Sequence, residues 1–394
     1  GNQNTSSCYP YYQQMKDVNA SVVFGGEQVN KLPVYSPYST TLTWETIENS
    51  GFGVDFAMFG SRLSGSFDWY QRTTKDMVGP AAALTALYGA SAPRTNNATL
   101  RTRGWELEMK WRDNIGKFNY GIGFSLSDYN SVVTKYYNST GQCTDANNGT
   151  YWYEGKKVGE IWGYQILGIA KSDDEMDQYL AKVDQAALGT KWGGGDFMYA
   201  DLNGDHKVDG GSYTLDDHGD LKRIGNTTPH YAYSITLDGS YKWFDFRVYF
   251  QGIGKRDYVF PNSAPYFGIA SEWQRTLYKE HLDYFRFAGS ELGSNQDPFY
   301  GRIRIDGNNT KISDRFVENA AYCRLKNVQL GFTIPFSEAA KKYIKHCRIY
   351  VSGENLLTFT NLRIFDPEAI NGAWGPGKSY PNYRTFSVGA DIKF

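Results

Sequence analysis

The sequence lacks any long hydrophobic run. Among its 394 residues the longest apolar candidate is Ala81–Ala92, which Thr85, Tyr88 and Gly89 interrupt. A membrane helix needs about 20 consecutive, mainly apolar residues, so the sequence predicts no such helix. The mean hydropathy of −0.54 is that of a soluble chain, but the strands of a membrane barrel give only a weak hydropathy signal per segment.

Cysteine is scarce and charge is balanced. The sequence has four cysteines without C-x-x-C or metal-ligand spacing, at Cys8, Cys143, Cys323 and Cys347. Forty-one basic residues face 42 acidic ones, for a net charge of −1. Basic runs interleaved with aromatic residues are absent, so we expect no nucleic-acid partner.

The sequence also lacks catalytic motifs. It has no phosphate-binding loop, dinucleotide fingerprint or G-x-S-x-G nucleophile motif. Glu106 and Glu108 form one of several acid pairs, but no pair has a spacing that indicates a glycosidase. We therefore predict no catalytic residue.

Tyrosine and glycine are abundant, with 31 and 42 residues, which favours strands and loops. Nine segments between about Thr41 and Phe394 are apolar at every second residue. Because side chains alternate along a strand, each segment would have one apolar and one polar face. A representative apolar row consists of Tyr120, Ile122, Phe124 and Leu126.

The connections between these segments alternate between short and long. The short ones fall near residues 59–62, 112–117 and 242–244, and the longest occupy residues 130–230 and 255–319. The segments run about 10 to 14 residues, longer than ordinary strands of about 5 to 6. This pattern predicts an all-β, transmembrane antiparallel barrel with tight periplasmic turns and long extracellular loops. Counting directions adds one strand within Val18–Gly25, for about ten.

Six blocks, in order, resemble the SusC/RagA family of TonB-dependent outer-membrane transporters. The resemblance covers nearly the whole chain. The blocks are Leu42–Val78, Tyr199–Asp209, Ile224–Tyr258, Tyr322–Pro335, Arg348–Leu362 and Tyr380–Phe394.

The resemblance implies a barrel of about 22 strands around an N-terminal plug. It implies import of oligosaccharides, or of peptides in some members, beneath a SusD-like surface lipoprotein with energy relayed by TonB. Because plug and TonB box are missing, residues 1–394 are expected to be the C-terminal barrel part, with about the last ten strands. The expected partners are the N-terminal remainder, the lipoprotein lid, TonB through the plug, an oligosaccharide ligand and membrane lipid.

The expected location is the outer membrane of a Gram-negative, Bacteroidetes-type cell. The terminal Phe394 continues the apolar row of the last strand and resembles an assembly signal for outer-membrane proteins. One alternative is a peptide importer of the same architecture. Another is a secreted, soluble, β-rich carbohydrate-binding protein or glycosidase.

One motif has the spacing of a Ca²⁺ loop. Oxygen ligands at positions 1, 3, 5, 7 and 9 resemble an EF-hand loop, with Ca²⁺ favoured over Mg²⁺. The motif departs from that pattern at His206, where glycine is usual, and at Ser212, which replaces the bidentate glutamate. The alternative is a solvated Asp/Asn-rich turn. The candidate ligands are Asp201, Asn203, Asp205, the carbonyl of Lys207, and Asp209.

Aromatic residues in the long connections are candidates for contact with a ligand or with the lid. Large amphipathic rings give contact area at low entropic cost and stack on sugar faces. The alternative is that they pack the loops against one another. The candidates are Trp152, Trp162, Trp192, Tyr266, Trp273, Trp374 and Tyr380.

Overall fold

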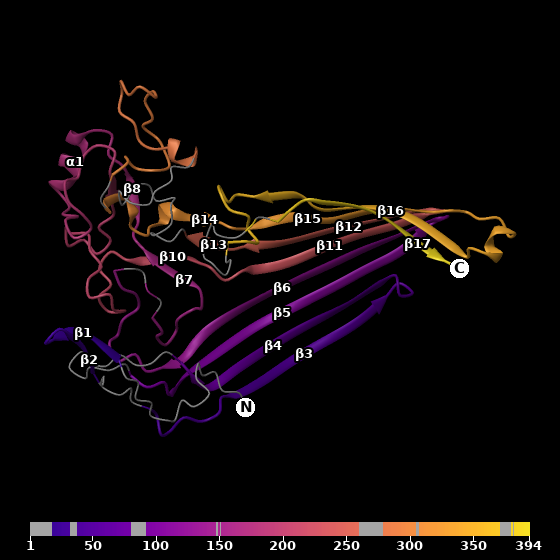
Figure 1. The fold of residues 1–394 in the computed structure, drawn as a ribbon, viewed down its shortest axis with the longest axis horizontal. Coiled ribbons are helices and arrows are strands. Elements are labelled where there is room, and N and C mark those ends of the chain that lie inside the picture. The colour runs from indigo at the N-terminus through magenta and orange to yellow at the C-terminus, as the bar shows by residue number, and fades with distance from the viewer. Residues whose placement is uncertain are drawn as a thin grey trace.

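The computed structural model describes residues 18–31, 38–79, 92–146, 149, 151–259, 279–304, 307–370, 380 and 382–394. Its main element is a curved antiparallel sheet of nine strands, in the order β17-β16-β15-β12-β11-β6-β5-β4-β3 (Figure 1). The sheet is open, with β17 and β3 at its edges. The strands are β3 (Thr46–Met58), β4 (Leu63–Val78), β5 (Asn96–Ile115), β6 (Phe118–Tyr136), β11 (His230–Tyr241), β12 (Phe244–Lys255), β15 (Tyr322–Thr333), β16 (His346–Thr360) and β17 (Thr385–Lys393).

Smaller elements lie in the long connections. Two-stranded sheets pair β7 with β10, β8 with β9, and β13 with β14. Within the described residues no helix has the length and hydropathy needed to cross a bilayer. The elements are β7 (Glu160–Gly163), β8 (Ile166–Ile169), α1 (Asp173–Leu180), β9 (Phe197–Tyr199), β10 (Lys222–Asn226), β13 (Asp257–Val259), β14 (Val317–Asn319) and 3-10 turns at Lys279–Leu282, Asn308–Thr310 and Asp314–Phe316; a further 3-10 turn, Ala340–Lys342, joins β15 to β16.

The prediction of an extra barrel strand within Val18–Gly25 is wrong. This segment forms β1 (Val18–Phe24), which pairs with β2 (Glu27–Lys31) in a separate hairpin. The two strands are joined at Gly25 and Gly26, both with positive φ, so the chain turns back on itself. The sheet of the described residues therefore has nine strands.

The predicted alternation of connections is confirmed. The short connections between β3 and β4, β5 and β6, β11 and β12, and β15 and β16 lie together at one end of the sheet, and α1 and the small sheets lie at the other (Figure 1). Gly116 adopts a φ of +61° in the two-residue turn between β5 and β6, a conformation that tight hairpins require. The longest connections, predicted at 130–230 and 255–319, lie between β6 and β11 and between β12 and β15.

The strand register places the apolar rows side by side. Phe67 of β4 lies opposite Leu107 of β5, which lies opposite Leu126 of β6. On the other face a continuous polar row crosses five strands, through Ser66, Glu108, Ser125, Ser234 and Gln251. The predicted apolar and polar faces are therefore continuous across the sheet.

The register is also staggered. Successive partners lead from Met58, at the turn end of β3, to Phe386, near the loop end of β17. Such a stagger corresponds to tilted strands, which closure into a barrel requires. The nine strands thus have the geometry of part of a barrel wall.

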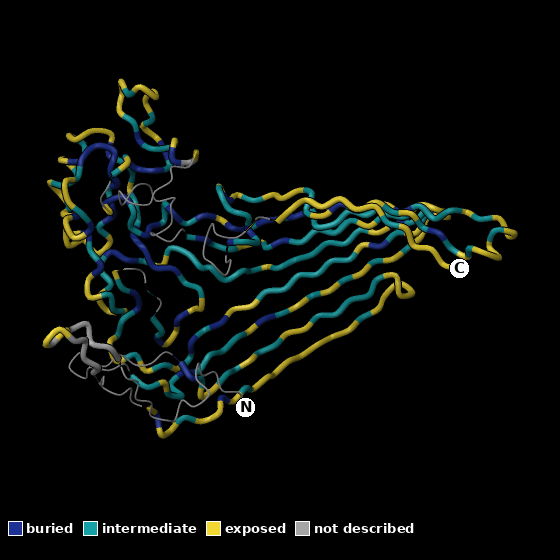
Figure 2. The backbone as a smooth tube through the Cα atoms, viewed as in Figure 1, coloured by how far each residue is buried: buried dark blue, intermediate teal, exposed yellow. Residues whose placement is uncertain are grey.

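The height of the apolar face matches a membrane. On β5 the outward row begins at Asp113, continues through Trp111 and Trp105, and reaches Arg103. The ten rises between these two charged residues, at about 3.3 Å each and a tilt of about 40°, span about 25 Å, so the charges lie at the limits of an apolar band of the height found in outer-membrane barrels. Apolar side chains on this face are exposed, such as that of Phe386 at 75%, and the edge strand β3 is exposed along most of its length (Figure 2). The fold is therefore part of a transmembrane barrel wall, as predicted.

A charge on the outer face is expected to prevent assembly, whereas a change on the inner face is not. Val248 lies opposite Leu237 and Val328 on the apolar face, and its neighbour Arg247 lies opposite Asp238 on the polar face. We expect Val248→Arg to destabilise the barrel by about 2–4 kcal/mol, because a cation would enter hydrocarbon. Arg247→Ala should fold normally. The measurement is the fraction of heat-modifiable, folded barrel in membranes, and equal yields of the two variants would contradict the face assignment.

Candidate binding face and loop assembly

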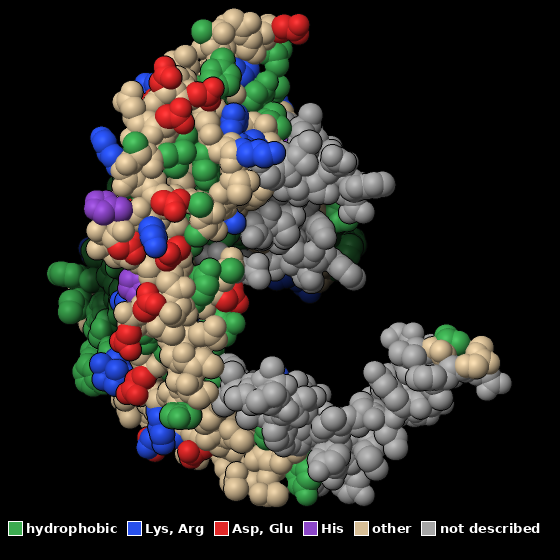
Figure 3. Space-filling view, turned by 90° about the vertical axis from the view of Figure 1, so that its left-hand side faces the viewer, with side chains coloured by type: hydrophobic (Ala, Val, Ile, Leu, Met, Phe, Trp, Pro, Cys, Tyr) green, Lys and Arg blue, Asp and Glu red, His purple; other side chains and the backbone are tan. Residues whose placement is uncertain are grey.

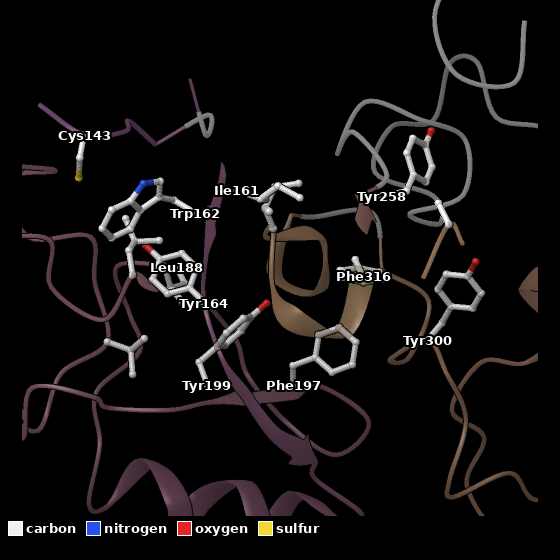
Figure 4. Packing of buried hydrophobic residues seen from close by; sticks show 14 of the residues in the cluster. Cys143, Ile161, Trp162, Tyr164, Leu188, Phe197, Tyr199, Tyr258, Tyr300 and Phe316 are labelled. Atoms are coloured by element: carbon white, nitrogen blue, oxygen red, sulfur yellow. The ribbon is translucent and has the colours of Figure 1, made fainter. Parts of the chain in front are cut away.

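The long connections pack into one unit, here called the loop assembly: the described parts of residues 137–229, 256–321 and 361–370. Its centre is Phe197 and Tyr199 of β9, both fully buried (Figure 4). The ring of Phe197 lies 5.9 Å from that of Phe316, and the ring of Tyr164 lies 5.9 Å from that of Tyr199. Ile370, from the third connection, belongs to the same core. Connections far apart in sequence thus share one hydrophobic core.

A buried carboxylate joins the first two connections. Asp196, with 0% of its side chain exposed, accepts hydrogen bonds from Arg302 Nε at 2.7 Å and Arg304 Nη1 at 2.7 Å. Asn309 Nδ2 and the backbone N–H of Gly193 also donate to it, at 2.9 and 3.0 Å. The cluster is fully paired, as burial of a charge demands. Sequence analysis missed it because 106 residues separate Asp196 from Arg302.

A second ionic cluster holds the third connection against the polar face of the sheet. Arg324 of β15 lies on the polar row and is 2% exposed. It donates to Asp366 at 2.6 Å, to Glu368 at 2.7 Å and to Thr358 Oγ1 at 2.9 Å, and Lys326 Nζ lies 2.8 Å from Glu368. Residues 361–370 therefore fold toward the inside of the barrel wall. The only sequence signal was an arginine on a polar strand row, which does not reveal its partners.

Nearer the short turns the polar face carries an open hollow of about 580 Å³. Charges of both signs line it, including Arg112, Asp238, Asp245 and Arg247. Gly121, on the same face, leaves space there, since a Cβ at this residue would lie 2.7 Å from Asp238 Oδ2. Viewed from the loop end, Lys, Arg, Asp and Glu side chains are scattered over the described surface (Figure 3). The inner wall is thus an aqueous surface suited to polar solutes.

Two of the predicted binding aromatics pack the loop assembly. Trp162 is 7% exposed within its core, and its Nε1 donates to Glu160 at 3.1 Å. Trp192 packs edge-on against Tyr199 at 6.2 Å and donates to the carbonyl of Gly189. These contacts position the loops and leave little of the Trp162 ring for a ligand.

The other predicted aromatics do not gather with them. Trp152 is half-buried, 6.1 Å from the ring of Tyr136 at the end of β6. Tyr380 is 85% exposed. The remaining candidates, Tyr266, Trp273 and Trp374, lie outside the described residues. A binding role for this set stays a prediction.

Burial sets the protonation of tyrosines in the core. Tyr153 donates its hydroxyl to Glu160, and desolvation followed by that carboxylate raises the pKa of Tyr153 well above its usual value. Burial likewise raises the pKa of Tyr164. Both hydroxyls therefore stay neutral over the physiological range, and Tyr153 remains a hydrogen-bond donor.

The predicted Ca²⁺ loop directs its oxygens at its own backbone. Asp201 accepts from the N–H groups of Gly204 at 2.6 Å and His206 at 2.9 Å, and Asn203 accepts from Asp205 at 2.9 Å. His206 has a φ of +66°, a left-handed conformation in which glycine is favoured. The histidine thus adopts the turn that the EF-hand pattern assigns to glycine.

A distant acid closes this loop. Asp220, 1% exposed, accepts from the N–H groups of Leu202 at 2.6 Å and Asp209 at 2.9 Å. Its burial raises its pKa, against the lowering effect of these bonds. Across the described part of the chain, no three His, Cys, Asp or Glu side chains converge in a metal-binding geometry. The loop oxygens thus accept from backbone N–H groups in this structure, and a Ca²⁺ site stays a prediction for Asp201, Asn203, Asp205, Lys207 and Asp209.

Phe394 follows the last residue of the edge strand β17 and is 78% exposed. Its backbone oxygen accepts from Lys345 Nζ at 3.0 Å. The residue lies at the end of the sheet that carries the short turns (Figure 1). Its assembly role stays a prediction.

A tilted barrel wall with an apolar outer face, a polar inner face and a packed loop assembly at one end defines a class: transmembrane antiparallel β-barrels of the outer-membrane type. The chain is 27% identical over 416 residues to TonB-dependent receptor P3 of Formosa agariphila, covering 100% of the chain and 38% of that protein. It is 22% identical over 362 residues to TonB-dependent receptor SusC of Bacteroides thetaiotaomicron, covering 91% and 33%. No family model matches the chain.

The fold is similar to a solved structure titled "Structure of the RagAB peptide transporter". The TM-score is 0.70 at 21% identity, with 98% of this chain and 39% of that chain covered. The curated relatives that the chain matches are thus TonB-dependent receptors, SusC among them, and the solved structures that it resembles share its fold. The chain spans between 33% and 39% of the length of the TonB-dependent receptors that it matches.

Removing the buried carboxylate should loosen the loop assembly and leave the barrel intact. In Asp196→Ala two arginines lose their partner inside the protein, a change that costs about 3–5 kcal/mol. We expect faster hydrogen exchange in residues 191–196 and 302–309 but unchanged exchange in β5 and β6. Asp177→Ala, at an exposed position of α1, is the matched control. Exchange at wild-type rates in Asp196→Ala would show that the cluster does not hold the loops.

Calcium is expected to stabilise the loop at Asp201 if the predicted site forms on binding. Added Ca²⁺ at about 100 times its Kd would contribute about 2.7 kcal/mol to the stability of the bound state. The measurement is protection of residues 199–212 from protease with Ca²⁺ against chelator, in wild type and in Asp201→Asn. Asp216→Asn, an exposed acid of the same loop, is the control. Identical digestion with and without Ca²⁺ would reject the site.

Proposed function

We propose that the chain is part of an outer-membrane transporter that imports oligosaccharides with a SusD-like surface lipoprotein, using energy relayed by TonB. The observation that carries this proposal is the register of the sheet, which separates a continuous apolar face from a continuous polar one. The location in the outer membrane of a Bacteroidetes-type cell follows from the same proposal. The chemistry is transport, in which no bond is made or broken.

The open edges of the sheet support a larger barrel. Strands β3 and β17 each lack a second neighbour within the described residues. In a bilayer their free backbone groups would remain unpaired at a cost of several kcal/mol each. The N-terminal remainder of the transporter would supply the missing strands, and its plug would connect the barrel to TonB.

The inner wall supports passage of a hydrated solute. The hydroxyl row at Ser66, Ser125 and Ser234 offers donors and acceptors that can rotate to suit different ligands. Residues 361–370, anchored by Arg324, would narrow the space enclosed by the barrel wall near its loop end. An imported ligand would pass this segment after leaving the loop assembly.

The surface of the loop assembly supports a protein lid. Large apolar side chains are exposed on it, a feature that commonly marks interaction sites. A surface lipoprotein would cover them when it closes over the barrel. These residues are Leu167, Leu282, Phe287 and Leu292.

Peptide import is the second candidate. A structural neighbour is titled a peptide transporter, and the hollow of the inner wall carries both acidic and basic groups. Peptides have charges of both signs, whereas neutral oligosaccharides have none. The proposal for oligosaccharides and this alternative share the same transport path.

Uptake by the intact system separates the two substrates. We expect deletion of the transporter gene to abolish growth on one class of defined oligosaccharide and to leave growth on peptides unchanged. Complementation with the full-length gene should restore growth. Loss of peptide uptake alone would favour the peptide importer. Recovery of the full-length protein in an aqueous extract without detergent would reject membrane transport and favour the secreted, soluble protein.

A further inference from the structure

The outer face changes its chemistry in steps toward the loop end of β3, β4 and β5. One row across these strands is apolar, with Val54, Phe67 and Leu107. The next row is aromatic, with Phe52, Trp69 and Trp105. Aromatic belts of this kind lie at the level of lipid headgroups. The rows above it must therefore face headgroups.

Those upper rows carry basic side chains. Arg103 lies one row above Trp105, opposite Gln71, and Arg101 lies one row further, opposite Thr73 and Val132. An isolated bridge pairs Val132 with Lys157 of the loop assembly, which brings Lys157 into the row of Arg101. At about 4.8 Å per strand, Arg101 and Lys157 are about 10 Å apart at the backbone. Three cations from two separate segments thus share one patch, here called the Arg101 patch.

The carboxylates on these rows have partners of their own. Glu48, which lies in the row of Arg101, is 2.5 Å from Lys75 Nζ. Asp128, opposite Trp105, is 2.6 Å from His230 Nδ1. Within the described residues Arg101, Arg103 and Lys157 form no ion pair shorter than 4.0 Å. Their charges remain available to an anion from outside.

One arginine is already oriented. Arg103 Nε donates to Gln71 Oε1 at 2.7 Å, which leaves both terminal nitrogens of the guanidinium for another acceptor. A planar guanidinium binds phosphate through two parallel hydrogen bonds. The residue is exposed, so a headgroup at this level can reach it.

We propose that the Arg101 patch binds the phosphate of an anionic, acylated lipid in the outer leaflet. The inference rests on the proposed function, because it requires the apolar face to lie in a membrane. The aromatic row directly below supports a lipid as occupant, since it would contact the acyl chains and sugar or glycerol of the molecule whose phosphate the cations hold. A protein partner or a second copy of the chain would need carboxylates at the height of an aromatic belt.

The test uses the full-length transporter in detergent, with diphosphorylated lipid A as the probe. Binding is followed by native mass spectrometry in wild type and in the triple variant Arg101→Gln, Arg103→Gln, Lys157→Gln. Because three cations near an anionic surface are lost, we expect the triple variant to bind roughly 100-fold more weakly. Arg101→Lys with Arg103→Lys keeps the charge and should lose less.

Arg72→Gln is the matched control. Arg72 is exposed on the same strands at the same height, opposite Thr102 on the polar face. It should bind lipid A as wild type does. A heat-modifiability assay on each sample confirms that the barrel has formed, so loss of lipid binding with an intact barrel bears on this inference and not on the proposed function.

Any of the following results would overturn the inference. One is equal binding by wild type and the triple variant. Another is an equal loss in Arg72→Gln, which would show attraction to overall charge. The third is displacement of lipid A by inorganic phosphate at equal concentration, or undiminished binding of the dephosphorylated lipid, which would show that lipid-borne phosphate is not what the patch recognises.

Discussion

Side chains on a strand point alternately to two faces, and in this protein the two faces meet different solvents. That constraint accounts for the outer rows of Phe, Leu and Trp and for the inner rows of Ser, Glu and Arg. A slip of one residue would exchange the faces, so the register of each strand pair is strongly specified. The shared register from β3 to β17 makes the wall continuous, and its stagger makes the wall curve. Placement of the loop assembly at one end follows from the alternating connections.

The loop assembly is held together by side-chain packing and ion pairs rather than by strand pairing. Its segments have little regular structure, so their backbone order must come from side chains. The aromatic core around Tyr199 contributes apolar burial, and Asp196 joins segments that are distant in the chain. Arg324 ties a third segment to the barrel wall. These buried ion pairs specify where each loop lies, because a misplaced loop would leave a charge without its partner. The assembly and the wall are thus coupled through a small number of side chains.

Periodicity predicted the wall well and the loops poorly. The alternation of Trp105, Leu107 and Met109 with Glu106 and Glu108 depends only on neighbours two residues apart, and it identified the faces correctly. The direction count failed at Val18–Gly25, where the segment has strand character but pairs locally with β2. Trp162 illustrates another limit of the sequence. An indole ring suits a binding surface, yet the fold places this one in a core. Burial depends on segments that sequence alone does not bring together.

The sequence by itself determined the strand faces and the order of short and long connections, because these depend on local spacing, and its ordered blocks of residues indicated the resemblance to TonB-dependent receptors. Only the tertiary structure decided which charges meet. Asp196 finds Arg302 across 106 residues, and Lys157 reaches the row of Arg101 through a bridge to Val132. Ion pairs act over a few ångströms in space, and a one-dimensional sequence does not encode that distance directly.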